Sequence, residues 1–423
     1  MANAAGTNWA ANLAYSAARL HTPSSVDEVR RIVAAASSIR ALGSRHSFNS
    51  IADGTEELMS TAALTGPVRI DREAMVATVG AGTRYGELAV ELQSAGFALA
   101  NLASLPHISI GGAIATGTHG SGDRNTSLAA AVVGLEFVTA GGELARYDAG
   151  DPNFEGMVVN LGALGVVTEV TLAIEPTFEV AQSVFENLSW NAVSENFDAL
   201  TGSAYSVSMF TSWQNLDVFD MAWLKSRVGS DATPTLFGAL PAQGERHPIP
   251  NLPAVGCTPQ LGIAGPWFDR LPHFRLNFTP SNGVELQSEY VVPRRFAVEA
   301  LAALRFLSAE IAPLLQVCEI RTVAADDLWL SSSYGTDVMG MHFTWKQDQP
   351  AVEALLPALE AVLEPFSARP HWGKLFTTDP ERLAGLYPKI GDFCRLVRDL
   401  DPEGVFANPF LDLNVTGAAA SRR

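Results

Sequence analysis

The segment from residue 101 to residue 122, NLASLPHISIGGAIATGTHGSG, constrains the fold of this chain more than any other part of it. Its five glycines, at positions 111, 112, 117, 120 and 122, alternate with serine and threonine. Because glycine has no Cβ, backbone N–H groups in such a segment can converge closely on an anion. The apolar residues Ile108, Ile110 and Ile114 favour a packed segment over a loose surface loop. We therefore predict a loop that cradles a diphosphate within a folded domain.

Two common nucleotide-binding motifs do not account for the glycines. The P-loop is excluded because no Gly-Lys-Ser or Gly-Lys-Thr follows them. A second run, Gly80-Ala-Gly82-Thr-Arg-Tyr-Gly86, resembles the nicotinamide-dinucleotide fingerprint in outline. However, its glycine spacing is one residue too long, and no acidic residue ends a second strand about 20 residues later. We interpret this run as a tightly packed turn between a strand and a helix.

The first 175 or so residues alternate between helical and strand patterns. Ser25 lies three positions before Glu28 at the start of VDEVRRIVAAA, which is typical of a capped helix. Strands are predicted for IRAL, which ends at Gly43, and for MVATVG, which leads into a turn and a helix in GAGTRYGELAVELQSAG. LAAAVVGLEFVTAGGELARY predicts a hairpin about Gly141 and Gly142, and LGALGVVTEVTLAIEP predicts a glycine-rich turn and a strand.

The pattern changes near Pro176. From there to about residue 370, the runs HFRLNFT, VELQSEYVV, CEIRTV and GMHFTWK alternate as antiparallel strands with one polar face do. Helices are predicted in FAVEALAALRFLSAEIAPLL and AVEALLPALEAVLEPF. Residues 228–265 are rich in Pro, Gly and Ala and predict an irregular excursion. The predicted fold class is α+β, with a second domain whose sheet exposes a polar face.

Charge and cysteine content exclude several classes of protein. The formal net charge of −17 argues against nucleic acid and membrane surfaces as partners. The three cysteines are widely spaced, which argues against a disulfide framework and a zinc site, so no metal is expected. Neither a signal-peptide pattern nor an apolar stretch of about 18 residues is present. We expect a cytoplasmic monomer.

Three motifs in order resemble those of a known flavoprotein superfamily. GSRHSFN is followed about 60 residues later by NLASLPHISIGGAIATGTHGSG, and then by NLGALGVVTEVTL. Together they resemble the FAD-binding domain of the vanillyl-alcohol-oxidase superfamily. More narrowly, the chain is similar to the alditol oxidases (xylitol and sorbitol oxidases), with the aldonolactone oxidases as close relatives. ELQSEY, CEIRTV, HFTW and RPHWGKLF extend the resemblance, which runs from Asn8 to about Phe410.

The resemblance implies a vanillyl-alcohol-oxidase-type fold of two domains. The FAD-binding domain is expected over residues 1–178. A substrate or cap domain, an antiparallel sheet flanked by helices, is expected over residues 179–370. Residues 371–423 are expected to complete the FAD-binding domain and the active site.

The resemblance also implies that FAD is bound covalently to His46. Imidazole is a nucleophile near neutral pH, and in the family it bonds to the 8α-methyl group of the flavin. Because no cysteine precedes Cys257, we expect a single attachment. Arg45 stands where a glycine would be expected. Its positive charge would either change the reduction potential of the flavin, or its side chain would point to solvent without effect. The other positions that match cofactor contacts are Gly43, Ser44, Arg45, Ser47, Phe48, Ala103, Ser104, Ser109, Gly112, Ala113, Thr116, Gly117, His119, Gly162, Gly165, Val167 and His371.

The later sheet is expected to supply the substrate side of the site. Glu319 and Arg321 are two positions apart, so on a strand they share one face. By spacing alone they equally describe a salt bridge on the surface. In the resembling family the pocket above the flavin is lined at the positions of Ser104, Glu319, Arg321, His342 and Lys374.

The implied reaction is oxidation of the terminal primary hydroxyl of an alditol (xylitol, sorbitol or glycerol) to the aldose, with O2 reduced to H2O2. His342 is the candidate base, because its unperturbed pKa is nearest to the working pH. Lys374 is the alternative, since neighbouring cations would depress its pKa. Arg321 and Lys374 would stabilise developing negative charge, and Glu319 and Ser104 would hold substrate hydroxyls.

Two other functions stay open at this point: an aldonolactone oxidase or dehydrogenase, and a sugar-binding protein without activity. In the superfamily a small residue near Ala103 affects whether oxygen reaches the flavin. The preference for an oxidase over a dehydrogenase therefore rests on the resemblance.

Overall fold

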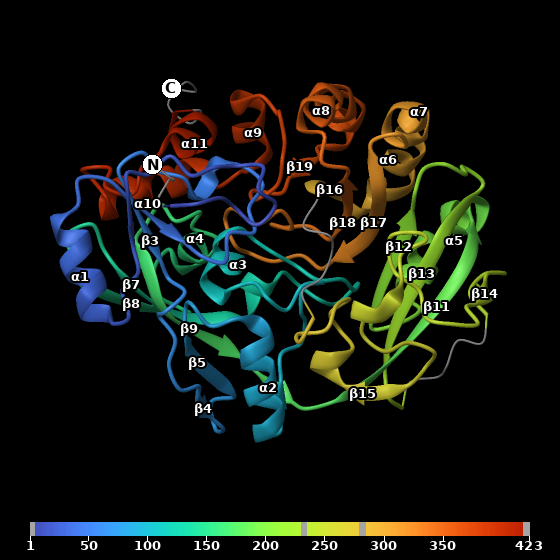
Figure 1. The fold of residues 1–423 in the computed structure, drawn as a ribbon, viewed down its shortest axis with the longest axis horizontal. Coiled ribbons are helices and arrows are strands. Elements are labelled where there is room, and N and C mark those ends of the chain that lie inside the picture. The colour runs from blue at the N-terminus through green and yellow to red at the C-terminus, as the bar shows by residue number, and fades with distance from the viewer. Residues whose placement is uncertain (1–4, 230–234, 279–284, 418–423) are drawn as a thin grey trace.

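The computed structural model describes residues 5–229, 235–278 and 285–417. Its first part contains a three-stranded sheet, a five-stranded sheet and one short strand pair, with helices around them (Figure 1). A parallel sheet has the strand order β1 (Arg19–His21), β3 (Glu57–Ser60), β2 (Ile39–Leu42). An antiparallel sheet has the order β4 (Arg69–Asp71), β5 (Val76–Gly80), β9 (Val166–Ala173), β7 (Val132–Val138), β8 (Leu144–Asp148). The helices here are α1 (Val26–Ala35), α2 (Tyr85–Ala95), α3 (Ile110–Ala115) and α4 (Phe154–Val158), and β6 (Phe97–Ala98) pairs with β10 (Glu175–Pro176).

A larger antiparallel sheet forms the second part. Its order is β14 (Leu240–Pro241), β11 (Glu179–Ser189), β13 (Val218–Arg227), β12 (Ser206–Thr211), β17 (Leu315–Val323), β18 (Val338–Trp345), β16 (Leu286–Pro293), β19 (Arg369–Pro370), and β15 (Ala264–Pro266) also pairs with β11. Its helices are α5 (Trp190–Thr201), α6 (Ala297–Leu304), α7 (Ser308–Ile311) and α8 (Gln349–Leu363). Apolar residues of α5, α6 and α8 pack with Ile320 and Phe343 in one buried cluster, so these helices cover one face of the sheet (Figure 1).

The chain then returns to the first part. The C-terminal helices are α9 (Pro380–Leu386), α10 (Ile390–Leu400) and α11 (Pro409–Leu411), and Figure 1 shows α10 and α11 beside the N-terminal elements. Ile39 in β2 donates its backbone N–H to the carbonyl of Val405, 2.8 Å away. The side chain of Asn408 donates to the carbonyl of Asp53 at 2.7 Å. The two ends of the chain are therefore joined by direct hydrogen bonds.

The local patterns of the first part predicted its elements well. Ser25 caps α1 by accepting the backbone N–H of Glu28 at 3.3 Å. The predicted hairpin is β7–β8, and Gly142 in its turn has a φ of +77°, which favours glycine. A Cβ at Gly82 would lie 2.0 Å from the carbonyl oxygen of Thr61, so this turn is tightly packed, as predicted.

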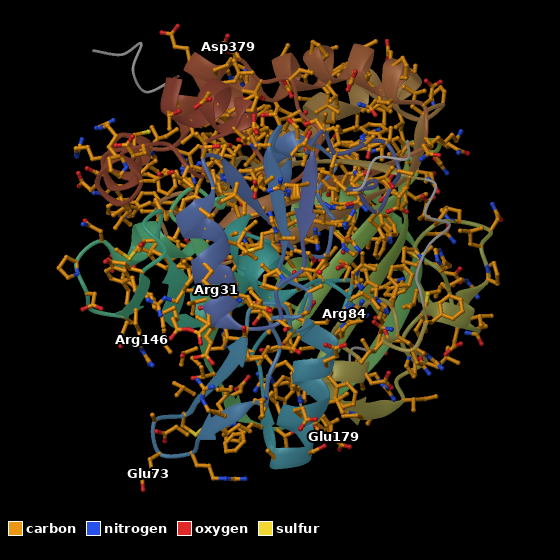
Figure 2. All side chains as sticks on the ribbon, turned by 60° about the vertical axis from the view of Figure 1, so that its left-hand side comes forward. Arg31, Glu73, Arg84, Arg146, Glu179 and Asp379 are labelled. Carbon is orange, nitrogen blue, oxygen red and sulfur yellow. The ribbon has the colours of Figure 1, made fainter. Side chains whose placement is uncertain are left out.

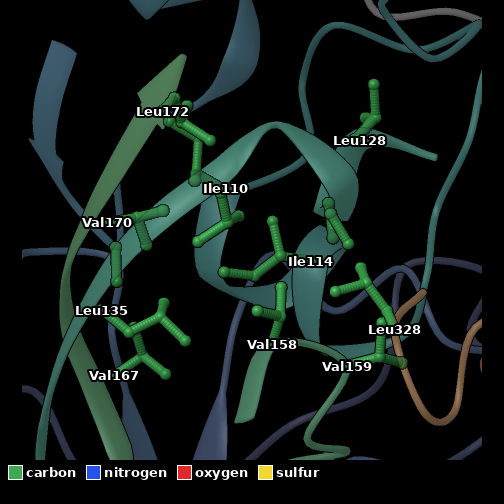
Figure 3. Packing of buried hydrophobic residues seen from close by; sticks show 14 of the residues in the cluster. Ile110, Ile114, Leu128, Leu135, Val158, Val159, Val167, Val170, Leu172 and Leu328 are labelled. Carbon is green, nitrogen blue, oxygen red and sulfur yellow. The ribbon is translucent and has the colours of Figure 1, made fainter. Parts of the chain in front are cut away.

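The glycine-rich segment is packed, as its apolar residues predicted. Ile110 and Ile114 of α3 are fully buried among Leu128, Val158 and Val170 (Figure 3). Charged side chains such as Arg31, Glu73 and Glu179 project outward instead (Figure 2). The loop is thus held on a helix whose apolar side belongs to the core.

One strand prediction about the second part was wrong, and one helical stretch was confirmed with an interruption. HFRLNFT forms turns and no strand over its described residues, because its backbone bonds to loops: His273 donates to the carbonyl of Ser104 at 3.1 Å. The helix predicted over residues 296–315 breaks into α6, a 3-10 turn at Arg305–Leu307, and α7. The spacing of apolar residues no longer matches one buried helix face at this point, since Phe306 is apolar but 87% exposed. The excursion over residues 228–265 contains only short elements in its described portion, as expected.

The prediction that the polar face of the sheet is exposed was also wrong. Glu319 and Arg321 do share a face, while Ile320 points into the helix-covered cluster. However, Glu319 and Arg321 are each only 6% exposed, and they line a cavity together with residues of the first part such as His46. The polar face therefore becomes the wall of an internal site.

Arg40 joins three distant segments, and we expect its guanidinium to matter for stability. It is 1% exposed and donates to the carbonyls of Ile51, Leu161, Gly162 and Phe406 at 2.6 to 2.8 Å. Lysine cannot reproduce this fork of donors. Arg40→Lys should lower the free energy of unfolding by about 2–4 kcal/mol, because buried carbonyls lose their partners.

Chemical denaturation of the purified variants measures this effect. Arg19→Lys is the matched control, since the Arg19 side chain is 66% exposed and should change stability by less than about 0.5 kcal/mol. Equal midpoints for Arg40→Lys and the wild type would contradict the prediction.

Candidate functional site

His46 follows strand β2 through a sharp turn. Gly43 opens the turn, Arg45 has a φ of +63°, and His46 lines a cavity that residues of both parts of the chain enclose. The Arg45 guanidinium donates to the carbonyls of Ala5 and Thr7 at 2.5 and 3.1 Å and lies over the ring of Tyr15. The Arg45 side chain therefore binds the N-terminal segment at Ala5, Thr7 and Tyr15.

The imidazole of His46 is held on two sides. Its Nδ1 atom lies 2.9 Å from the carbonyl oxygen of Ser44, and the ring of Trp9 stacks on it at 5.2 Å between centroids. Burial lowers the pKa of His46 to about 4, and the charge of Lys374 adds to the effect. The ring is thus neutral near pH 7, which is the nucleophilic form of imidazole.

The His46 turn and the glycine-rich segment interlock. The N–H of Ser44 donates to Ser109 Oγ at 3.2 Å, and the N–H of Ser109 donates to Ser44 Oγ at 3.1 Å. A Cβ at Gly43 would lie 2.8 Å from Ser109 Oγ and 3.2 Å from the Cα of Gly112. Only glycine permits this approach, so two stretches of bare backbone face the cavity together. Such backbone suits a diphosphate, as the sequence predicted.

Strand register brings the acidic and basic groups of the opposite wall together. Glu289 in β16 and Glu319 in β17 both lie directly across from His342 in β18. Cross-strand partners point to the same face of a sheet. One row across three strands therefore presents two carboxylates and an imidazole to the cavity.

Glu289 is the hub of this wall. Its side chain is 2% exposed and lies 2.8 Å from Arg321 Nη2, 3.1 Å from His119 Nε2 and 3.2 Å from His342 Nδ1. Burial alone would raise the pKa of Glu289, but the charge of Arg321, with the contact to His119, outweighs it and holds the pKa well below its usual range. Glu289 is therefore a carboxylate that orients His342.

Burial also shifts the pKa values of Lys374, His342 and Glu319. Burial lowers the pKa of Lys374 to about 8, and its Nζ donates to the side-chain oxygen of Gln287. Burial, assisted by Lys374, also lowers the pKa of His342. Burial would raise the pKa of Glu319, but Arg321 and His273 outweigh it and hold the pKa well below its usual range. The wall thus carries the carboxylates of Glu289 and Glu319 beside the cations Arg321 and Lys374, with the neutral imidazole of His342 between them.

The structure brings nearly all the predicted site residues to one cavity. The predicted residues that line it are Gly43, Ser44, Arg45, His46, Ser47, Phe48, Ala103, Ser104, Gly112, Ala113, Thr116, His119, Gly162, Gly165, Val167, Glu319, Arg321, His342, His371 and Lys374. Ser109 and Gly117 do not line it. Ser109 instead accepts a hydrogen bond from the backbone N–H of Ser44 in the His46 turn. Gly117 follows the end of α3 with a φ of +68°.

Among the polar groups of the wall that sequence reasoning did not single out are Glu285, Gln287, Glu289 and His273. Gln287 and Glu289 lie in LQSEY, and their spacing of two places them on one face of a strand, so the alternation carried a usable signal. His273 lies in a segment that was interpreted as a strand. No local pattern marks its contact with Glu319.

Comparisons with known proteins agree with this arrangement. A family profile for an FAD binding domain matches residues 17–148, and one for D-arabinono-1,4-lactone oxidase matches residues 283–414. An alditol oxidase of Streptomyces sp. is 46% identical over 408 residues, which cover 96% of this chain and 97% of the relative. L-gulono-1,4-lactone dehydrogenase of Mycobacterium tuberculosis and L-gulonolactone oxidase of Mus musculus are 27% and 26% identical, each over 96% of this chain and 97% of the relative.

Solved structures share the fold. Cholesterol oxidase from B. sterolicum superposes with a TM-score of 0.77 at 17% identity, covering 97% of this chain and 96% of the other. A solvent-stable cholesterol oxidase gives a TM-score of 0.76 at 18% identity, with 97% of each chain covered. The predicted α+β fold of the vanillyl-alcohol-oxidase type is confirmed. No helix in the described part of the chain is long and apolar enough to cross a bilayer.

Proposed function

The chain belongs to the alditol oxidase family of FAD-dependent flavoproteins, and from this premise we propose that it oxidises the terminal primary hydroxyl of an open-chain polyol to the aldehyde, with O2 as acceptor. One observation carries the proposal: a buried wall of Glu289, Glu319, Arg321, His342 and Lys374 faces the His46 turn across one cavity. Charged side chains are costly to bury, and these ones match a substrate with several hydroxyls.

We further propose that FAD lies against the His46 turn and the glycine-rich segment and is attached through His46. The residues fit this group in two respects. Gly43 and Gly112 pack so closely that a Cβ at Gly43 would lie 2.8 Å from Ser109 Oγ, so this part of the cavity lining is bare backbone, and His46 is neutral and lines the same cavity. Gly162 and Gly165 would contact the same group further along. When bound, the flavin supplies a hydride acceptor whose electrons pass to O2 to form H2O2.

The protein's own groups would then bind the alcohol and remove its proton. His342, oriented through Nδ1 by Glu289, would accept the hydroxyl proton. Arg321 and Lys374 would stabilise the developing negative charge on the substrate oxygen. Glu319 and Ser104 would hydrogen-bond the other hydroxyls and so bind the polyol. Cytoplasmic location and a monomeric state stay predictions.

A substrate panel tests the proposed function. Purified protein incubated with xylitol, sorbitol or glycerol should consume O2 and release H2O2. Gulonolactone is the competing substrate, because the D-arabinono-1,4-lactone oxidase profile matches residues 283–414. Turnover of the lactone alone would assign a lactone oxidase or, with an artificial acceptor in place of O2, a lactone dehydrogenase. If no polyol is turned over and none bleaches the yellow colour, the remaining interpretation is a sugar-binding protein without activity.

The pH dependence should distinguish the two candidate bases. A base works above its pKa, and the pKa of His342 is lowered, so the rise in kcat/KM should be complete below the usual histidine range. Lys374 acts as a cation below its pKa of about 8, so kcat/KM should fall as the pH rises through that value. Lys374→Met should remove the alkaline fall. A profile that instead rises near pH 8 would make Lys374 the base.

A further inference from the structure

A fully buried lysine lies behind the substrate wall. Lys225 in β13 has no exposed surface, and its Nζ lies 3.1 Å from Nδ1 of His273. The same Nζ also donates to the carbonyls of Leu271 and Pro272. Burial lowers the pKa of Lys225 to about 7, and the three acceptors around Nζ match the three protons of its ammonium form. No carboxylate contacts Lys225 in the described part of the chain, so among the described residues its hydrogen-bonded connection to the wall runs through His273.

His273 connects this lysine to the cavity. Its Nε2 lies 2.8 Å from Oε1 of Glu319, and its backbone N–H donates to the carbonyl of Ser104 at 3.1 Å. The ring is 5% exposed and is held edge-on by Trp223 and Phe210 at 5.1 and 5.7 Å between centroids. Thus one residue touches both groups that are proposed to hold substrate hydroxyls.

The hydrogen-bond pattern determines which ring nitrogen of His273 carries the proton. Glu319 is a carboxylate, so the facing Nε2 must donate to it. Burial lowers the pKa of His273 to about 4, so the ring is neutral and its Nδ1 must accept. Lys225 supplies the donor that Nδ1 requires. The hydrogen bonds are therefore donated in one direction: Lys225 donates to His273, and His273 donates to Glu319.

We propose that Lys225 and His273 are positioning residues that hold Oε1 of Glu319, so that its other carboxylate oxygen accepts a substrate hydroxyl; this rests on the proposed polyol oxidation. His273 is the closest donor to Glu319, since the Nε of Arg321 lies 3.7 Å from the same oxygen. Arg321 is itself engaged by Glu289 at 2.8 Å. No described residue donates to Glu319 Oε2. The carboxylate of Glu319, which would accept a substrate hydroxyl, is thus oriented by its hydrogen bond to His273.

A matched pair of variants at position 273 tests the proposal. The amide of asparagine reaches the place of Nδ1 but not that of Nε2, whereas glutamine can put an N–H near the place of Nε2. His273→Asn should raise KM for xylitol by about 10-fold or more, the effect of losing a hydrogen bond to a charged group. Its kcat should change by less than about 3-fold, because Glu319 binds ground state and transition state alike. His273→Gln should recover most of the loss in KM.

Lys225→Met tests the lysine separately. It should raise KM in the same way, and the double variant with His273→Asn should be no worse than His273→Asn alone, since the lysine acts through the histidine. Thermal midpoint and flavin content are recorded for every variant. An unchanged KM with a lower midpoint, additive effects in the double variant, or no recovery with glutamine would overturn the proposal. Absence of xylitol turnover in the wild type would instead overturn the proposed function.

Discussion

Replacing His46 with alanine should release the flavin from the polypeptide. When the wild type is precipitated with acid, the pellet should stay yellow, whereas the His46→Ala pellet should be colourless and the supernatant yellow. The physical reason is that a neutral imidazole is the nucleophile that forms the bond, and burial holds the pKa of His46 at about 4. Alanine at position 46 leaves the backbone of Gly43 and Gly112, which lines the cavity, unchanged. The variant should therefore still bind FAD, but reversibly.

Two measurements make this result specific to position 46. His21→Ala is a suitable control, because His21 lies in β1 and pairs with Glu57 without lining the cavity. Its pellet should remain as yellow as that of the wild type. A colourless wild-type pellet would refute covalent attachment altogether. A yellow His46→Ala pellet would place the bond on another side chain.

Replacing His342 with alanine should cause the largest loss of rate. The reduction of the bound flavin by xylitol without air should slow by about 10²–10⁴-fold, the usual contribution of a positioned base. His342 is suited to this role because burial and Lys374 keep it neutral, and Glu289 holds its Nδ1 at 3.2 Å. Stopped-flow bleaching of the yellow colour measures the step directly, before O2 takes part.

The neighbouring residue on the same strand provides the control. Met341 is fully buried and points to the helix-covered side of the sheet, away from the cavity. Met341→Leu should therefore keep the rate of bleaching within about 3-fold, since such swaps conserve volume. Retention of the wild-type rate in His342→Ala would pass the role of base to Lys374. Lys374→Met would then be the variant that loses the rate.

The candidate site shows how far local sequence reasoning reaches. The spacing of Glu319 and Arg321 predicted a shared face, and the structure confirms it. The same spacing did not distinguish a surface salt bridge from a buried pair. Alternation in the segment of His273 predicted a strand that does not exist, because alternation alone does not supply a neighbouring strand to pair with. His273 instead reaches Glu319 from a turn.

The sequence by itself determined the direction of side chains relative to their own backbone: the cap of α1, the packed side of α3, the turn before His46 and the polar face of β17. These depend on neighbours only a few positions away, so short patterns record them. The tertiary structure alone decided that Glu289 and Glu319 both lie across from His342, that this face is buried, and that Lys225 stands behind it. Register and burial depend on the packing energy of the whole chain, which no short run of residues contains.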